Sequence, residues 1–120
     1  MINTYQELKT EINRMENAFA QAFFKNETKK TEKLNKFLKV LYNLEDAWII
    51  WHKAKITKEC IVTDVVRYGK TYDEETLKKR RSEYLKAELT EYEALKKRRK
   101  IAEDVEKFPW EDNENQIEMF

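Results

Sequence analysis

The chain has 120 residues and a net charge of +1, which excludes two sizeable domains and the strong positive charge of a dedicated duplex-DNA binder. Charged residues make up 39% and hydrophobic ones 41%, whereas Gly69 is the one glycine, Pro109 the one proline and Ser82 the one serine. Because β-hairpin turns depend on Gly, Pro, Asn, Asp and Ser, this composition excludes a strand-rich fold and predicts an all-α chain.

The first predicted helix covers about residues 3 to 25. Its apolar residues alternate in steps of three and four, the spacing of a helix that packs lengthwise on another. They are Tyr5, Leu8, Ile12, Met15, Phe19 and Ala22. The polar residues 26–29 break this stripe and predict a short loop.

The second predicted helix runs from about residue 31 to at least residue 56 and has the same spacing. Its apolar residues are Leu34, Phe37, Leu41, Leu44, Trp48 and Trp51. Two such helices joined by a short loop should form an antiparallel hairpin. Residues 60–68 are β-branched in part, but a lone strand cannot satisfy its backbone. We therefore expect a continuation of this helix or a second short helix, ended by Gly69 in the left-handed conformation.

The third predicted helix runs from about residue 73 to about residue 106 and is capped by Thr71 or Asp73. We expect its apolar face to comprise Tyr84, Leu85, Leu89, Tyr92 and Leu95. The predicted fold is an elongated helical hairpin plus a long third helix, arranged as a three-helix bundle or coiled coil in a domain of residues 1–107. Seams of this length are also compatible with a homodimer.

Residues 108–120 are predicted to form a flexible acidic tail. The tail has four carboxylates and no Lys or Arg, so residues 1–107 carry a net charge of +5. Phe108-Pro109-Trp110 precedes the acidic residues. We interpret these three residues as a helix stop whose rings cover the end of the bundle, with a second partner anchor as the alternative.

The peptide Gln116-Ile117-Glu118-Met119-Phe120 closes the sequence. It resembles the peptide by which bacterial replication and repair proteins bind the DNA polymerase sliding clamp. That peptide is a glutamine, an aliphatic residue, a small or acidic residue, then Leu or Met, then Phe. Every position fits.

The resemblance implies a role for each residue of this peptide. Gln116 would hydrogen-bond at the rim of a groove between two clamp domains, and Ile117 would make the aliphatic contact. Met119 and Phe120 would fill the hydrophobic pocket, while Glu118 would face solvent. Two alternatives stay open: these side chains dock on the chain's own helices, or the tail acts like the acidic tail of single-stranded-DNA-binding proteins, which have Pro where Met119 stands.

Two basic clusters on the third helix are candidate contacts for nucleic acid or for a protein partner. Leu77-Lys78-Lys79-Arg80-Arg81 recurs 18 residues later as Leu95-Lys96-Lys97-Arg98-Arg99, which is five helical turns, so both clusters point the same way. The arginines that could grip phosphates are Arg80, Arg81, Arg98 and Arg99. Nearby glutamates at helical spacing favour a solvated face instead.

The predicted turn around Gly69 interleaves aromatic and basic residues, a pattern that single-stranded nucleic-acid sites use. Its candidate contact residues are Arg67, Tyr68, Lys70 and Tyr72. The same pattern is common in ordinary turns. Trp48 and Trp51 fall on the helical seam and are expected to pack there rather than stack on bases.

No catalytic centre or metal site is predicted. His52 is the sole histidine and Cys60 the sole cysteine, so neither a metal site nor a disulfide can be completed from them. The sequence lacks a nucleophile-base pair and a glycine-rich phosphate loop. We therefore expect a non-enzyme without cofactor, small-molecule substrate or membrane span, and the single cysteine is typical of the cytoplasm.

The expected function is that of a DNA replication or recombination accessory protein that binds the bacterial sliding clamp, compatible with a phage or mobile-element origin. Two alternatives are a coiled-coil inhibitor or adaptor of another host protein and a single-stranded-DNA-binding recombination mediator. The mediator would use residues 25–58, which hold nine lysines and four acidic residues, together with the turn at Arg67–Tyr72.

Overall fold

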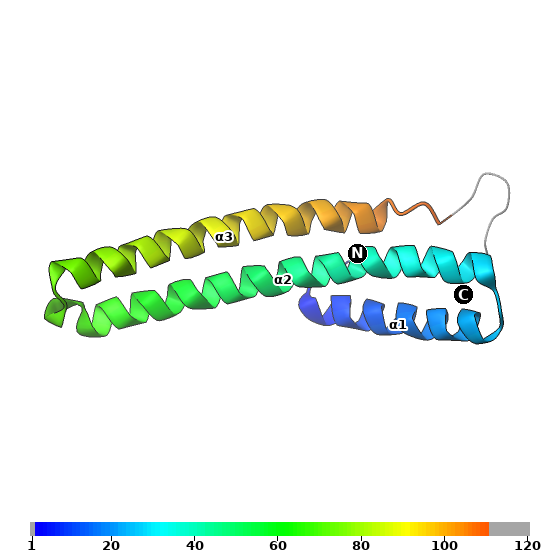
Figure 1. Ribbon diagram of the computed structural model, residues 1–120, viewed down its shortest axis with the longest axis horizontal. Helices are drawn as coiled ribbons and strands as arrows, with labels where there is room; N and C mark the ends of the chain where they lie inside the picture. The colour runs from blue at the N-terminus through cyan, green and yellow to red at the C-terminus, as the bar shows by residue number, and fades with distance from the viewer. Residues whose placement is uncertain (1, 111–120) are drawn as a thin grey trace. The chain divides into compact units, whose positions relative to one another are not determined.

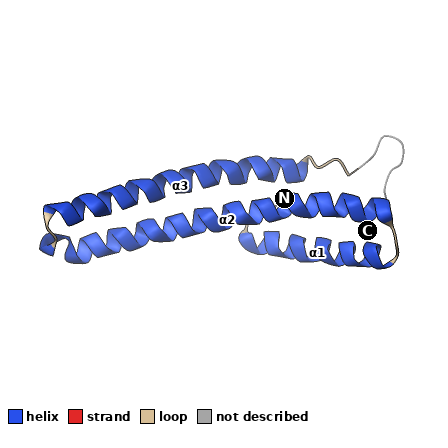
Figure 2. Ribbon diagram, viewed as in Figure 1, coloured by secondary structure: helices blue, strands red, loops and turns tan. Residues whose placement is uncertain are grey.

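The computed structural model describes residues 2–110, and the peptide Gln116–Phe120 lies outside them. The described residues form the helices α1 (Tyr5–Phe24), α2 (Thr28–Tyr68) and α3 (Glu74–Glu106), with a short 3₁₀ turn, η1 (Gly69–Thr71), between α2 and α3. Between residues 2 and 110 no strand occurs (Figures 1 and 2), which confirms the all-α prediction. Residues 60–68 continue α2, as one of the two alternatives predicted.

Both ends of α1 are closed by local hydrogen bonds. The Thr4 hydroxyl accepts the Glu7 amide at 3.1 Å and caps the first turn. At the other end the Glu27 amide donates to Ala22 O and the Asn26 amide to Phe23 O. This is a Schellman motif, and Asn26 takes its left-handed position with a φ of 57°.

The described residues form two compact units. The first consists of residues 2–46 and 99–110, in which α1 packs antiparallel on the first part of α2 (Figure 1). Its buried side chains are Leu8, Ile12, Met15, Ala22, Leu34, Phe37, Leu38, Leu41 and Leu44. Most of them belong to the two predicted stripes, so the three-and-four spacing located this core.

Polar pairs join α1 to α2 along the edge of this core. Lys9 Nζ lies 2.8 Å from Glu45 Oε2, and the Tyr42 hydroxyl donates to Glu16 Oε2 at 2.7 Å. In the same unit, the Phe37 ring packs against Phe108 and Trp110 at centroid distances of 4.9 and 4.4 Å. The rings after α3 therefore cover this core, which confirms their interpretation as a helix stop.

The Tyr42–Glu16 bond should make tyrosine ionisation a probe of the first unit. Bonding to Glu16, together with partial burial, raises the pKa of Tyr42 to about 12 from 10.0. A raised pKa means that this contact stabilises the fold below pH 10 and is lost as the pH approaches 12. We expect Tyr42 to ionise later than an ordinary tyrosine in an absorbance titration. Glu16→Gln should advance that ionisation, whereas Glu11→Gln should leave it unchanged; a Glu16→Gln titration identical to the wild type would contradict the bond.

The second unit, Ala47–Arg98, is an antiparallel hairpin of α2 and α3 (Figure 1). Its buried side chains are four alanines, Ala47, Ala54, Ala87 and Ala94, and one large residue, Ile61. The predicted apolar face of the third helix was wrong in part, because Leu85, Leu89 and Tyr92 are 55%, 57% and 60% exposed. Alanines occupy the seam instead.

The turn of this hairpin differs from the prediction at Gly69. No glycine in residues 2–110 has a positive φ, so Gly69 does not end α2 in the left-handed conformation. The chain turns through η1, where the Tyr72 amide donates to Gly69 O at 3.3 Å. Asp73 Oδ1 then accepts the Thr76 amide at 2.8 Å and caps α3, which confirms one of the two predicted caps.

No described helix combines the length and the apolar character that a membrane crossing requires.

Candidate interaction surface of the hairpin

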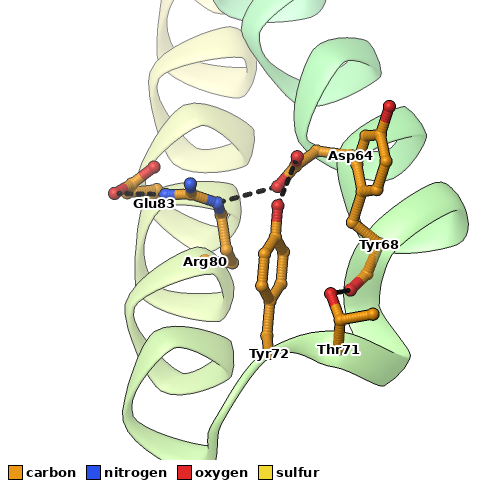
Figure 3. Close-up of polar contacts among 6 residues, drawn as sticks. All are labelled: Asp64, Tyr68, Thr71, Tyr72, Arg80 and Glu83. Carbon is orange, nitrogen blue, oxygen red and sulfur yellow. Dashed lines mark hydrogen bonds and ion pairs between the residues drawn. The ribbon is translucent and has the colours of Figure 1, made fainter.

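A polar network closes the tip of the hairpin, and Asp64 is its centre. Its Oδ1 accepts the Tyr72 hydroxyl at 2.7 Å, and its Oδ2 accepts Arg80 Nε at 2.9 Å. Figure 3 shows the Tyr72 ring standing between the two helices with its hydroxyl directed at Asp64. Arg80 also reaches Glu83 Oε1 at 3.5 Å. We call Asp64, Tyr72, Arg80 and Glu83 the tip network.

The tip network shifts the pKa values of Asp64 and Tyr72 in opposite directions. The hydrogen bonds from Tyr72 and then Arg80 lower the pKa of Asp64 below its ordinary 3.8. The hydrogen bond to Asp64, followed by desolvation, raises the pKa of Tyr72 above 10.0. The network is therefore intact between these two ordinary values and weakens as the pH falls below the first or rises above the second.

Replacing Asp64 by Asn should loosen the tip at neutral pH. The uncharged amide cannot form the charged pair with Arg80, so amides of η1 and the flanking turns should exchange hydrogen faster. Because wild-type Asp64 is itself protonated at low pH, the difference should narrow as the pH falls below 3.8. Exchange measured by NMR checks this, with the exposed Glu59→Gln as the control. Equal exchange in Asp64→Asn and wild type at pH 7 would contradict the role of Asp64.

The basic cluster of α3 recurs after 18 residues, and one arginine of each copy, Arg80 and Arg98, lies in the seam. Arg80 takes the Asp64 carboxylate, whereas the Arg98 guanidinium lies 3.9 Å from the centroid of the Trp48 ring and 4.8 Å from that of Trp51. Between them Lys58 pairs with Glu91 at 3.0 Å. The tryptophans thus pack on an arginine within the unit, consistent with the expected seam position.

The predicted contact residues fall into two groups. Tyr72, Arg80 and Arg98 make the intramolecular contacts described above. Arg67, Tyr68, Lys70 and Arg81 are exposed in the hairpin unit, and Arg99 is exposed in the first unit. The clamp-binding residues Gln116, Ile117, Met119 and Phe120 lie outside the described residues.

An apolar groove between α2 and α3 was missed by the sequence prediction. It has a volume of about 330 Å³ and is lined by Val62, Val65, Val66, Leu77, Arg81 and Tyr84, among others. Val66 is 79% exposed and Val62 47%. The sequence signal for this groove was the run of β-branched residues at 61–66. When alanines fill the seam of a helix pair, some of these larger side chains must lie outside the seam.

Among residues 2–110 no group of three or more His, Cys, Asp or Glu could hold a metal ion. Comparison with known protein families, with curated proteins and with solved structures found no match to this chain.

Proposed function

We propose that the chain is an adaptor of DNA replication or recombination that binds a bacterial DNA polymerase sliding clamp through Gln116–Phe120. The observation that carries this proposal is the peptide itself, which fits the clamp-binding pattern at all five positions. Met119 and Phe120 are the anchors and Gln116 the polar contact. A short peptide with two buried large side chains binds with micromolar affinity, because each contributes about 1.5 to 3 kcal/mol and ordering the peptide offsets part of this.

The packing of the described residues supports a short binding segment. Phe108 and Trp110 contact Phe37, so their rings are occupied within the first unit. A clamp contact that also used these rings would have to remove them from this core, at the cost of their buried area. The binding determinants are therefore assigned to residues beyond Trp110.

The single-stranded nucleic-acid alternative has weaker support. Two of the residues that would form that site, Tyr72 and Arg80, already bind Asp64. At the turn, exposed Arg67, Tyr68 and Lys70 remain. These three residues supply few of the phosphate contacts that such a site requires, and the lysines of residues 25–58, which the mediator would also use, are divided between the two units.

A labelled peptide of residues 111–120, titrated into purified bacterial clamp, tests the proposal. We expect saturable binding below about 100 µM and no gain when the peptide is extended to Phe108. A peptide with residues 116–120 in scrambled order is the matched control, since it keeps the charge and composition. No saturable binding, or equal binding of the scrambled peptide, would exclude the proposal.

A further inference from the structure

The hairpin unit buries little apolar surface for its size. Four of its five buried hydrophobic residues are alanines, whereas the first unit buries leucines, Met15 and Phe37. The contribution of a buried side chain rises with its apolar area, so an alanine seam stabilises a helix pair only weakly. The larger apolar side chains of these two helices therefore lie mostly outside the seam.

Many of the larger apolar side chains of the hairpin unit are exposed. The large apolar side chains exposed within residues 47–98 are Ile49, Ile50, Ile56, Val62, Val65, Val66, Tyr68, Leu77, Leu85, Leu89 and Tyr92. In the described part of the first unit they are four: Tyr5, Phe23, Phe24 and Tyr42. Of those in the hairpin unit, Val62, Val65, Val66 and Leu77 line one groove, and a contiguous apolar patch of this kind marks an interaction surface.

One stripe of α3 has a self-complementary order. Its apolar residues Leu77, Tyr84, Leu85 and Tyr92 alternate with Arg81 and Glu88 at steps of three and four, which places all six on one side of the helix. About a midpoint between Tyr84 and Leu85 the order is symmetric: Leu77 is opposite Tyr92, and Arg81 is opposite Glu88. An antiparallel pair of such stripes matches apolar residues with apolar residues and each arginine with a glutamate.

The charges near this stripe also favour an identical partner. Arg80 is paired with Asp64 and Glu83, and Lys58 lies 3.0 Å from Glu91 but 4.0 Å from Glu88. Glu88 is consequently the more weakly paired carboxylate, with 54% of its side chain exposed. The stripe itself carries one exposed charge of each sign, Arg81 and Glu88, so it offers no excess of one sign to an acidic peptide or a nucleic acid.

We propose that a second copy of the chain docks on this surface, with the two α3 helices antiparallel across a two-fold axis between Tyr84 and Leu85. Arg81 of each copy pairs with Glu88 of the other, as an isologous contact requires. Leu77 and the adjoining groove with Val62 and Val66 face Tyr92 of the other copy. Two hairpins joined in this way form a four-helix layer that buries the apolar residues of the stripe and of the adjoining groove.

Light scattering of the full chain over a concentration series tests this proposal through charge exchange. We expect a mass of twice 14.7 kDa below about 200 µM, with the dissociation constant raised at least about tenfold by Arg81→Glu or by Glu88→Arg. Combining the two substitutions restores opposite charges across the axis, and the constant should return to within about threefold of the wild type. Lys79→Glu makes the same charge change on another side of α3 and should have little effect.

Three results would overturn the proposal. They are a single-chain mass at every concentration, a dimer that Arg81→Glu does not weaken, and a double variant no tighter than the two single variants. Far-UV circular dichroism of each variant verifies that its helices are intact, and the recovery in the double variant separates a lost contact from a lost fold.

Discussion

A chain with Met119→Ala and Phe120→Ala is expected to bind the sliding clamp about 100- to 10,000-fold more weakly than the wild type. The two side chains together contribute about 3 to 6 kcal/mol, and about 1.4 kcal/mol corresponds to a tenfold change. From a micromolar start, binding of the variant falls beyond the range of a direct titration. Fluorescence anisotropy with the labelled full chain measures the difference.

The control for this variant is Glu118→Ala. The resemblance assigns Glu118 to solvent, so the affinity should stay within about threefold of the wild type. Equal binding by the wild type and the double variant would show that residues 119 and 120 are not the anchors.

Leu41→Ala is expected to cost about 2 to 5 kcal/mol of unfolding free energy. Leu41 is fully buried in the core of the first unit, among Leu8, Met15, Leu34 and Leu44. Alanine removes the apolar contacts and leaves a cavity that neighbouring helices close only in part. Because the free energy of unfolding of a small domain is about 5 to 15 kcal/mol, this loss is a large share of its stability.

Urea denaturation followed by circular dichroism measures this loss. Leu89→Ala is the matched control, since the same atoms are removed from a side chain that is 57% exposed. Its unfolding free energy should change by less than about 0.5 kcal/mol. Equal midpoints for the two variants would contradict the assignment of Leu41 to the core.

The sequence predicted the first unit well because its core follows hydrophobicity. Leu34, Phe37, Leu41 and Leu44 are large apolar residues at a regular helical spacing, and all four are buried. The same reasoning also located α1 and α3 to within a few residues and favoured a helix at 60–68.

The hairpin unit was harder to predict because its seam is made of small residues. Ala87 and Ala94 are buried, although Leu85 and Leu89 are more hydrophobic. Alanine occurs on every helix face, so periodicity alone gives it no weight against leucine. The choice between the two faces depends on how closely the helices approach, which a single sequence does not contain.

The tip network depends on tertiary contacts in the same way. Asp64 and Tyr72 are on opposite sides of the turn, and Arg80 lies two helical turns into α3. Tyr72 and Arg80 were candidate contact residues in the sequence, whereas Asp64 was not among them. Their pairing depends on the register of α2 against α3. The 3₁₀ turn Gly69–Thr71 joins these helices, in place of the left-handed Gly69 that the sequence predicted.

The most direct measurement is a calorimetric titration of the full-length chain into purified bacterial sliding clamp, with the peptide of residues 111–120 as competitor. The proposed function predicts a micromolar dissociation constant and loss of the signal when the peptide is in excess. A full chain that gives no binding at about 100 µM, or that the peptide does not displace, would contradict it.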